Sequence, residues 1–206
     1  MPHRIGRRGG SAIHPPGPPP CPALWLLSDP LRLPDPTPLL ARLPRGAAVL
    51  LRGATPEVAL RVARICRMRG LWLLVSGEGR LALRIGAGLH VPDRAPTHGL
   101  LPFLRNRRGT WLSAAVHGRV GVARARRLRV DAVLASPVFP TESHPRAPAL
   151  GPLRWAALAR AAAGAAAGAA GRPAVALGGM TARRFRRLPR GLAAGWAGIG
   201  AWGDVS

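Results

Sequence analysis

The sequence predicts a small (β/α)8 TIM barrel, an α/β fold in which eight parallel strands alternate with helices. Three observations support this fold class. The chain has 206 residues, which suits one domain of the larger kind. Hydrophobic residues make up 48% of it, enough to bury a core. From residue 24 onward, short apolar runs alternate with longer amphipathic or alanine-rich runs, as in repeated βα units. A doubly wound sheet is the structural alternative.

Eight apolar runs are predicted to be the strands. They cover residues 24–27, 48–51, 71–75, 88–91, 111–116, 131–135, 174–177 and 197–201. Helices are predicted between them, near residues 37–43, 56–69, 79–86, 99–106, 119–127, 152–170 and 181–188. Because the sequence stops soon after the eighth run, we expect the last helix of the barrel to be truncated or missing. Apolar surface would then be left for a second copy of the chain to cover, as in a homo-oligomer.

The barrel is predicted to take residues 23–206, and residues 1–22 differ from it in composition. This N-terminal segment holds Arg4, Arg7 and Arg8 and the Pro-rich run PPGPPP at 15–20. Prolines favour an extended chain, so we expect a disordered basic extension. The segment has no continuous apolar stretch before a small-residue cleavage site and so lacks the pattern of a secretion signal.

Charge and cysteine content narrow the class of protein. The formal net charge is +23, and all 31 basic residues other than His are Arg. Such one-sided usage, with abundant Ala, Gly and Pro, favours nucleotide bias in the coding sequence over a nucleic-acid interface, although the charge still attracts anionic substrates. No apolar run approaches the roughly 20 residues of a membrane span. Only Cys21 and Cys66 are present, far apart, which excludes a disulfide framework and suits a reducing cytoplasm.

Polar residues follow several predicted strands, at the end of the barrel where ligands bind. Arg52 comes directly after the second strand, where a charged side chain must meet solvent, an acid or a bound anion. His117 follows the fifth strand and could bind a ligand, act as a base or lie satisfied in the rim. Asp93 follows the fourth strand and could help to hold a cation, although one carboxylate does not make a magnesium site.

Glycine pairs follow the last two strands. Gly178 and Gly179 precede Thr181, which can cap the next helix, and Gly198 and Gly200 lie in the eighth strand. Glycines let the backbone approach an anion, and the loops after strands seven and eight are the recurrent phosphate site of such barrels. The pattern therefore predicts a phosphorylated ligand. The alternative is that these glycines serve only the backbone of the turns.

Taken in order, the strand ends resemble the thiamine-phosphate synthase family and its close relatives, the thiazole tautomerases. The resemblance spans about residues 24–202 and is most specific in PVFPT at 137–141 followed by ALGGMT at 176–181. It implies a barrel that joins a pyrimidine methyl diphosphate to a thiazole phosphate in thiamine biosynthesis. The resemblance further implies that pyrophosphate would be released and that magnesium would assist.

The resemblance also implies roles for single residues. Arg52 would contact the diphosphate, His117 would line the pocket, and Asp93 would be the remaining magnesium carboxylate. The thiazole phosphate would be bound by Thr141, Gly178, Gly179, Gly198 and Gly200.

The chain departs from the family pattern around these positions, so we expect a degenerate active site. Leu50, Gly53 and Ala54 stand where the family has Gln, Glu and Lys, and the segment Ser76-Gly77 replaces an Asn-Asp pair. The alternatives are a thiazole tautomerase or a thiazole-phosphate binding protein without catalysis. Pro137 occupies a position where tautomerases can carry a His, so His117 would have to supply the acid-base chemistry.

Overall fold

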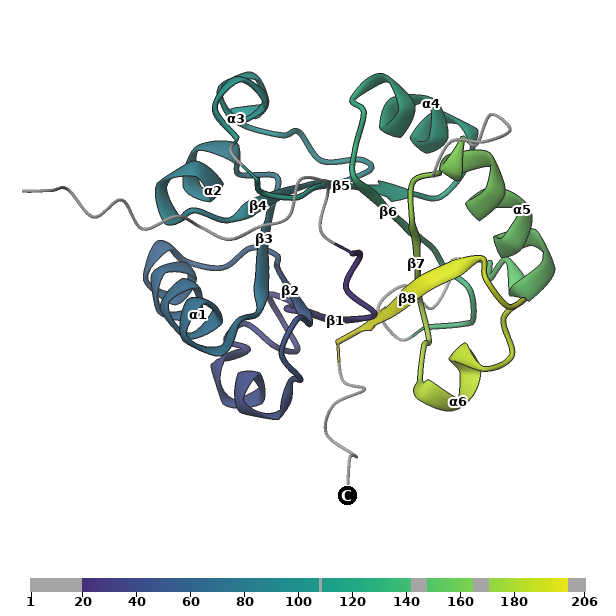
Figure 1. Ribbon diagram of the computed structural model, residues 1–206, viewed down its shortest axis with the longest axis horizontal. Helices are drawn as coiled ribbons and strands as arrows, with labels where there is room; N and C mark the ends of the chain where they lie inside the picture. The colour runs from purple at the N-terminus through teal and green to yellow at the C-terminus, as the bar shows by residue number, and fades with distance from the viewer. Residues whose placement is uncertain (1–19, 108, 142–147, 165–170, 200–206) are drawn as a thin grey trace, which may run out of the picture.

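The computed structural model describes residues 20–107, 109–141, 148–164 and 171–199. Its eight parallel strands form a closed barrel in the order of the sequence (Figure 1). The barrel closes because β1 pairs with both β2 and β8, so that Trp25 lies opposite Ala48 on one side and Ala197 on the other. The strands are β1 (Leu24–Leu27), β2 (Ala48–Leu51), β3 (Trp72–Ser76), β4 (Gly88–Val91), β5 (Leu112–Val116), β6 (Ala132–Ala135), β7 (Ala174–Leu177) and β8 (Ala193–Gly198).

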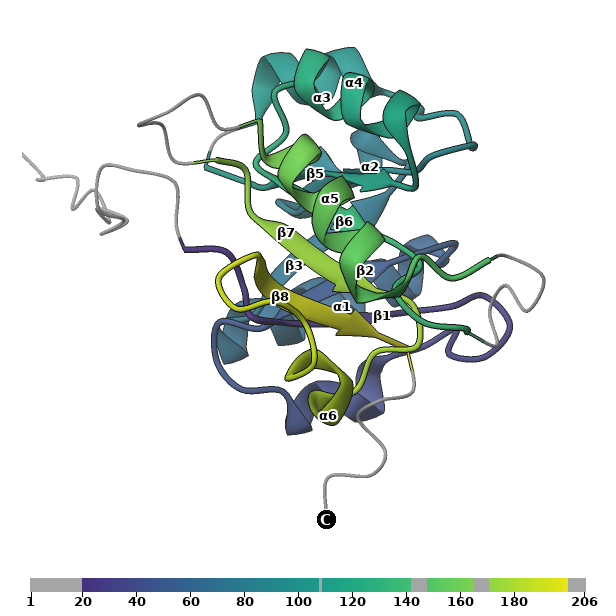
Figure 2. The same ribbon diagram turned by 90° about the vertical axis from the view of Figure 1, so that its right-hand side faces the viewer.

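Helices surround the barrel on its outside (Figures 1 and 2). The longer ones have clear end signals. Helix α1 starts after Thr55, whose Oγ1 accepts a hydrogen bond from the Val58 amide, and ends at Gly70 in the left-handed conformation. The helical elements are η1 (Thr37–Arg42), α1 (Pro56–Arg69), α2 (Gly79–Ile85), α3 (Leu100–Asn106), α4 (Arg119–Arg127), α5 (Gly151–Ala163) and α6 (Ala182–Phe185).

The core has two layers, because alternate residues of each strand point to opposite faces of the sheet. One buried cluster fills the inside of the barrel and includes Trp25, Leu50, Leu74, Leu134 and Val175. The larger cluster lies between the strands and the helices and includes Leu26, Val49, Leu89, Phe103 and Trp155. In the part of the chain that the structure describes, no helix is both long and apolar enough to cross a membrane.

The predicted fold class is confirmed, and seven of the eight strands lie within one residue of their predicted bounds. The eighth differs: β8 begins at Ala193, whereas the sequence predicts residues 197–201. Its first half is built of small residues, which give a weak strand signal. At Gly195 the reason is steric, because a Cβ there would lie 2.4 Å from the Ala23 carbonyl oxygen.

Two predicted helices are wrong in type or length. The segment predicted as a helix near 37–43 forms the 3-10 helix η1, since prolines at 34, 36 and 38 remove backbone donors. Helix α6 covers only Ala182–Phe185 of the predicted 181–188. The predicted helix 152–170 ends at Gly164, which adopts the left-handed conformation, and its remainder lies outside the described residues. The expected extension, apart from residues 20–22, and the truncated last helix also fall outside them.

Candidate active site at the carboxyl ends of the strands

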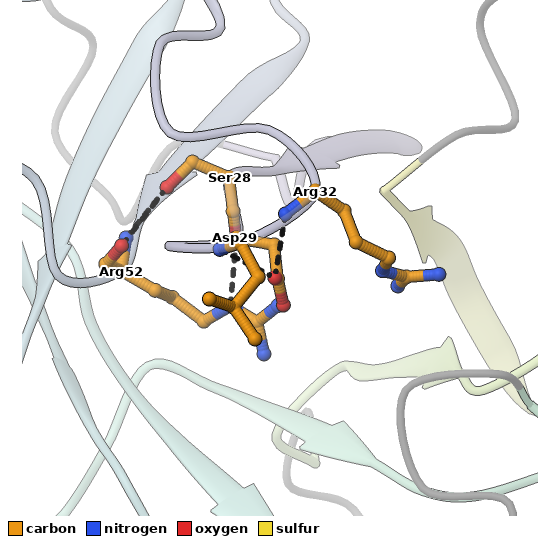
Figure 3. A network of polar contacts seen from close by, with 5 residues as sticks. Ser28, Asp29, Arg32 and Arg52 are labelled. Atoms are coloured by element: carbon orange, nitrogen blue, oxygen red, sulfur yellow. Dashed lines mark hydrogen bonds and ion pairs between the residues drawn. The ribbon is translucent and has the colours of Figure 1, made fainter.

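Arg52 is held in a fixed position at the end of β2. Figure 3 shows its side chain reaching back to the residues that follow β1. Its Nε donates to the Ser28 carbonyl oxygen at 2.7 Å, and its Nη2 forms an ion pair with Asp29 Oδ2 at 2.8 Å. The backbone amide of Arg52 also donates to Ser28 Oγ at 2.8 Å. Of the three guanidinium nitrogens, Nη1 takes no part in these contacts.

Asp29 links Arg52 to the loop after β1. Its Oδ1 accepts hydrogen bonds from the backbone amides of Leu31 and Arg32, each at 3.1 Å. Burial raises the pKa of Asp29, but these two hydrogen bonds and the Arg52 charge together hold it below its usual value. Burial lowers the pKa of Arg52, and the Asp29 charge opposes this. Since a guanidinium stays charged at neutral pH, the mouth of the barrel holds a fixed cation.

A row of polar side chains lies one layer above the apolar cluster that fills the barrel. Arg52, Ser76, Ser113 and Ser136 each come two residues after a member of that cluster, so that they face the inside as well. Ser76 on β3 pairs in register with His90 on β4, and His90 pairs with Ser113 on β5. The inward-facing polar residues of this layer are Arg52, Ser76, His90, Ser113 and Ser136.

His90 is a neutral group inside the barrel. It is buried, and its Nδ1 lies 2.9 Å from the buried Ser113 Oγ. Burial lowers the pKa of His90 to about 3, and the positive charges of Arg52, Arg124 and His117 lower it as well. The ring therefore offers one donor and one acceptor at neutral pH, and it serves as a hydrogen-bonding group rather than a cation.

His117 lies exposed at the mouth, directly after β5. Its Nδ1 is 2.8 Å from the carbonyl oxygen of Ser136 and 3.1 Å from the Ser136 hydroxyl. A carbonyl oxygen only accepts hydrogen bonds, so this contact assigns the proton to Nδ1. In the neutral ring, Nε2 then carries a lone pair and can accept a proton.

Asp93 is engaged with an arginine of α4. Arg124 Nη2 forms an ion pair with Asp93 Oδ1 at 2.9 Å, and Arg124 Nη1 donates to the Asp93 carbonyl oxygen at 2.6 Å. Among the described residues, no group of three or more His, Cys, Asp or Glu side chains is placed to hold a metal ion. With Asp29 and Asp93 both paired to Arg, these residues do not fit a magnesium site built from protein carboxylates.

The two segments that carry the family resemblance pack against each other. Gly178 has φ +96°, and a Cβ there would lie 2.8 Å from Pro137. Gly179 has φ +58°, and a Cβ there would lie 2.4 Å from the Pro140 carbonyl oxygen. The Phe139 amide donates to the Gly178 carbonyl oxygen at 3.1 Å. Close backbone contact with 137–140 therefore requires glycine at both positions.

Arg184 of α6 contacts both of these segments. Its Nη1 donates to the Gly179 carbonyl oxygen at 2.6 Å, and its guanidinium lies 5.2 Å from the centre of the Phe139 ring. Thr181 caps α6, as predicted, by accepting a hydrogen bond from the Arg184 amide. A second cation therefore lies beside the glycine turn.

The remaining predicted ligand residues are placed as follows. Thr141 is half-buried at the end of the segment after β6, and residues 142–147 lie outside the description. Gly198 is the buried last residue of β8 and pairs with Leu26 of β1. Gly200 lies outside the described residues.

The structure shows partners that the sequence did not predict. Asp29 is the ion-pair partner of Arg52, although 23 positions separate them in the sequence. Period-two alternation from the inward-facing Trp111 and Leu134 would have identified Ser113 and Ser136 as inward-facing residues. Nothing in the local sequence marks Arg124 as the partner of Asp93, because that contact depends on how α4 packs.

Comparisons with known proteins support the family and the fold. A family model described as thiamine monophosphate synthase matches residues 52–202. Thiamine phosphate pyrophosphorylase from Pyrococcus furiosus has a similar structure, with a TM-score of 0.67, 19% identity and coverage of 90% of each chain. A citrate synthase variant follows with a TM-score of 0.58, 10% identity and coverage of 89% of this chain and 88% of that one. At such identities the solved structures establish the fold alone. No curated protein sequence matches significantly.

Proposed function

Since the chain belongs to the thiamine monophosphate synthase family, we propose that it joins a pyrimidine methyl diphosphate to a thiazole phosphate. The observation that carries this proposal is the fixed cation at the end of β2. Arg52 is oriented by Ser28 and Asp29 at the end of the barrel where such folds bind ligands. A preoriented guanidinium suits a reaction in which negative charge grows on a leaving diphosphate.

In the proposed reaction, the bond between the pyrimidine methylene carbon and the diphosphate oxygen breaks, and its electron pair leaves with pyrophosphate. The lone pair of the thiazole nitrogen then forms a C–N bond with the resulting cation. No proton transfer is needed in this step, so stabilisation of charge matters more than a general base. We assign Arg52 to the diphosphate and the neutral His90 to the floor beneath the reacting groups.

The thiazole phosphate is assigned to the turn at Gly178 and Gly179. Both residues lack a Cβ beside the segment 137–140, and Arg184 adds positive charge next to them. Backbone amides and an arginine are the usual ligands of a phosphate group. Thr141 stays a predicted ligand of the same phosphate, as do Gly198 and Gly200.

The test is turnover of the full chain with both substrates, with and without magnesium, followed by mass detection of thiamine phosphate. Removing the charge in Arg52→Gln should reduce the rate by about 10²-fold or more. Arg107→Gln is the matched control. Arg107 pairs with Asp131 at 2.7 Å, and their side chains are 26% and 28% exposed, comparable to the 28% and 17% of Arg52 and Asp29. The control pair, however, lies at the end of the barrel where the strands begin. Absence of product from the wild-type chain would overturn the synthase, and binding of thiazole phosphate alone would then leave a non-catalytic binding protein.

A thiazole tautomerase is the second candidate, and the His117–Ser136 contact favours it. That contact leaves Nε2 of the neutral ring free to accept a proton at the mouth of the barrel. A tautomerase would aromatise a thiazole carboxylate phosphate without any diphosphate. His117→Gln should then abolish conversion, whereas the exposed His98→Gln should retain it. Conversion that survives His117→Gln would exclude this role.

A further inference from the structure

A cavity of about 170 Å³ lies at the opposite end of the barrel from the candidate active site. It is formed where α1 and α2 end and where β3, β4 and β5 begin. None of its lining residues takes part in the site described above. They include Cys66, Arg67, Trp72, Ile85, Thr110 and Trp111.

Among the described residues, two polar groups of this lining are buried without a hydrogen-bond partner. They are the Trp111 Nε1 atom and the Thr110 hydroxyl. Trp111 as a whole is only 3% exposed. Leaving a buried donor unpaired costs about 1–3 kcal/mol, so a native fold normally supplies a partner. Both residues line the cavity.

The charge of the lining favours an anion. Of the described residues that line the cavity, Arg67 alone carries a charged side chain, and its Nη1 donates to the Ile85 carbonyl oxygen at 3.2 Å. The described lining holds no Asp or Glu to balance this charge. Burial raises the pKa of the Cys66 thiol to about 12, so that sulfur stays neutral. A carboxylate would pair with Arg67 and accept from the indole N–H.

The shape favours a flat ligand. The rings of Trp72 and Trp111 meet edge to face, with centres 6.3 Å apart and planes at 78°. Both indoles line the cavity, and a flat aromatic ring packs well against such side chains. For comparison, a cavity of about 150 Å³ holds one benzene molecule.

We propose that this cavity is a binding site for a small planar monocarboxylate with a single six-membered ring. The carboxylate pairs with Arg67 and accepts a hydrogen bond from Trp111, and the ring packs against the two indoles. The site is independent of the proposed reaction, because it lies at the other end of the barrel.

The test uses benzoate as the probe and the full chain labelled with 15N. The chain has six Trp residues, so its indole N–H signals are few, and Trp111→Phe identifies the one from Trp111. Benzoate should shift that signal in a saturable way, whereas benzylamine, of the same size but opposite charge, should not.

Arg67→Gln should weaken benzoate binding by about tenfold or more, the effect of losing a charge-assisted hydrogen bond. Arg64→Gln, an exposed arginine of the same helix, is the matched control and should bind as the wild type does. Arg67 is itself exposed, so its variant remains informative even if Trp111→Phe does not fold. An unshifted Trp111 signal, equal binding of benzylamine, or unchanged affinity in Arg67→Gln would each overturn the proposal.

Discussion

At the scale of single residues, all four aspartates in the described part of the chain form ion pairs with arginines. The sequence has 8 acidic residues against 31 basic ones. At the carboxyl ends of the strands, Asp29 pairs with Arg52 at 2.8 Å and Asp93 pairs with Arg124 at 2.9 Å. The first pair connects the loop after β1 to the end of β2, and the second connects the loop after β4 to α4. These carboxylates therefore help to hold the loops at the mouth of the barrel in place. This use competes with metal binding, because a carboxylate oxygen that faces a guanidinium is not available to a divalent cation.

The buried His90 makes the stability of the fold depend on pH. Its pKa in the folded chain is about 3, below the ordinary 6.5, because it is buried and faces positive charges. Between these values, the unfolded chain binds a proton that the folded chain does not. The free energy of unfolding should therefore fall by up to about 1.4 kcal/mol per pH unit as pH drops below about 6.

Urea unfolding at pH 7 and pH 5 measures this effect. His90→Asn keeps a polar group beside Ser113 and should lose much of the difference between the two pH values. His98→Asn changes an exposed histidine and should keep it. An equal difference in wild type and His90→Asn would show that other groups cause the pH dependence.

Sequence position predicted where Arg52 and His117 lie, but not what they contact. A residue just after a strand must reach the mouth of a barrel, which is a local property. The contact of Arg52 with Asp29 depends on the register of β1 and β2, since 23 positions separate the two residues. The His90–Ser113 contact likewise depends on the register of β4 and β5. Such pairs follow only from the closed sheet.

At the scale of elements, the turn after β7 and the segment after β6 form one packed unit. The amides of Val138 and Phe139 donate to the carbonyl oxygens of Leu177 and Gly178. This extends the pairing of β6 with β7 beyond the strands. The segments PVFPT and ALGGMT therefore act together, and the glycines have a steric role whether or not a phosphate binds.

Gly179→Ala tests that steric role. A Cβ at Gly179 would combine a φ of +58° with a contact of 2.4 Å to the Pro140 carbonyl oxygen. We expect a loss of about 3 kcal/mol in the free energy of unfolding, from left-handed strain and overpacking. Gly191→Ala is the control, because its φ is +76° but nothing lies within 4 Å of its Cβ, and it should cost about 1 kcal/mol. Equal losses in urea unfolding would mean that the contact with Pro140 is relieved without cost.

Among the elements, the sequence predicted strands better than helices. Runs such as 48–51 and 132–135 are apolar on both faces because both sides of a barrel strand are buried, and this makes them easy to recognise. The first crossover lacks such a signal, since prolines convert the predicted helix into η1. The start of β8 gives a weak strand signal because it is built of small residues, of which Gly195 fits a crowded place beside Ala23.

At the scale of the whole molecule, the strands of the closed barrel pack against both layers of the core. Each of the eight strands has a neighbour on both sides. The two cysteines lie one in each layer: Cys21 packs against the cluster inside the barrel, and Cys66 belongs to the cluster beneath the helices. If the barrel opens as one unit, both thiols should become accessible together.

Thiol labelling along a urea gradient tests this cooperativity. Burial raises the pKa of Cys21 and of Cys66 to about 12, so that at pH 8 about one thiol in ten thousand is the reactive thiolate. A thiol-reactive disulfide reagent should therefore modify neither cysteine in the folded chain. In Cys21→Ser and in Cys66→Ser, the remaining thiol should react over the same urea range in which tryptophan fluorescence changes. Labelling of Cys21 well before that range would instead show that the segment before β1 detaches while the outer layer around Cys66 is still folded, and the closed barrel would then unfold in at least two steps.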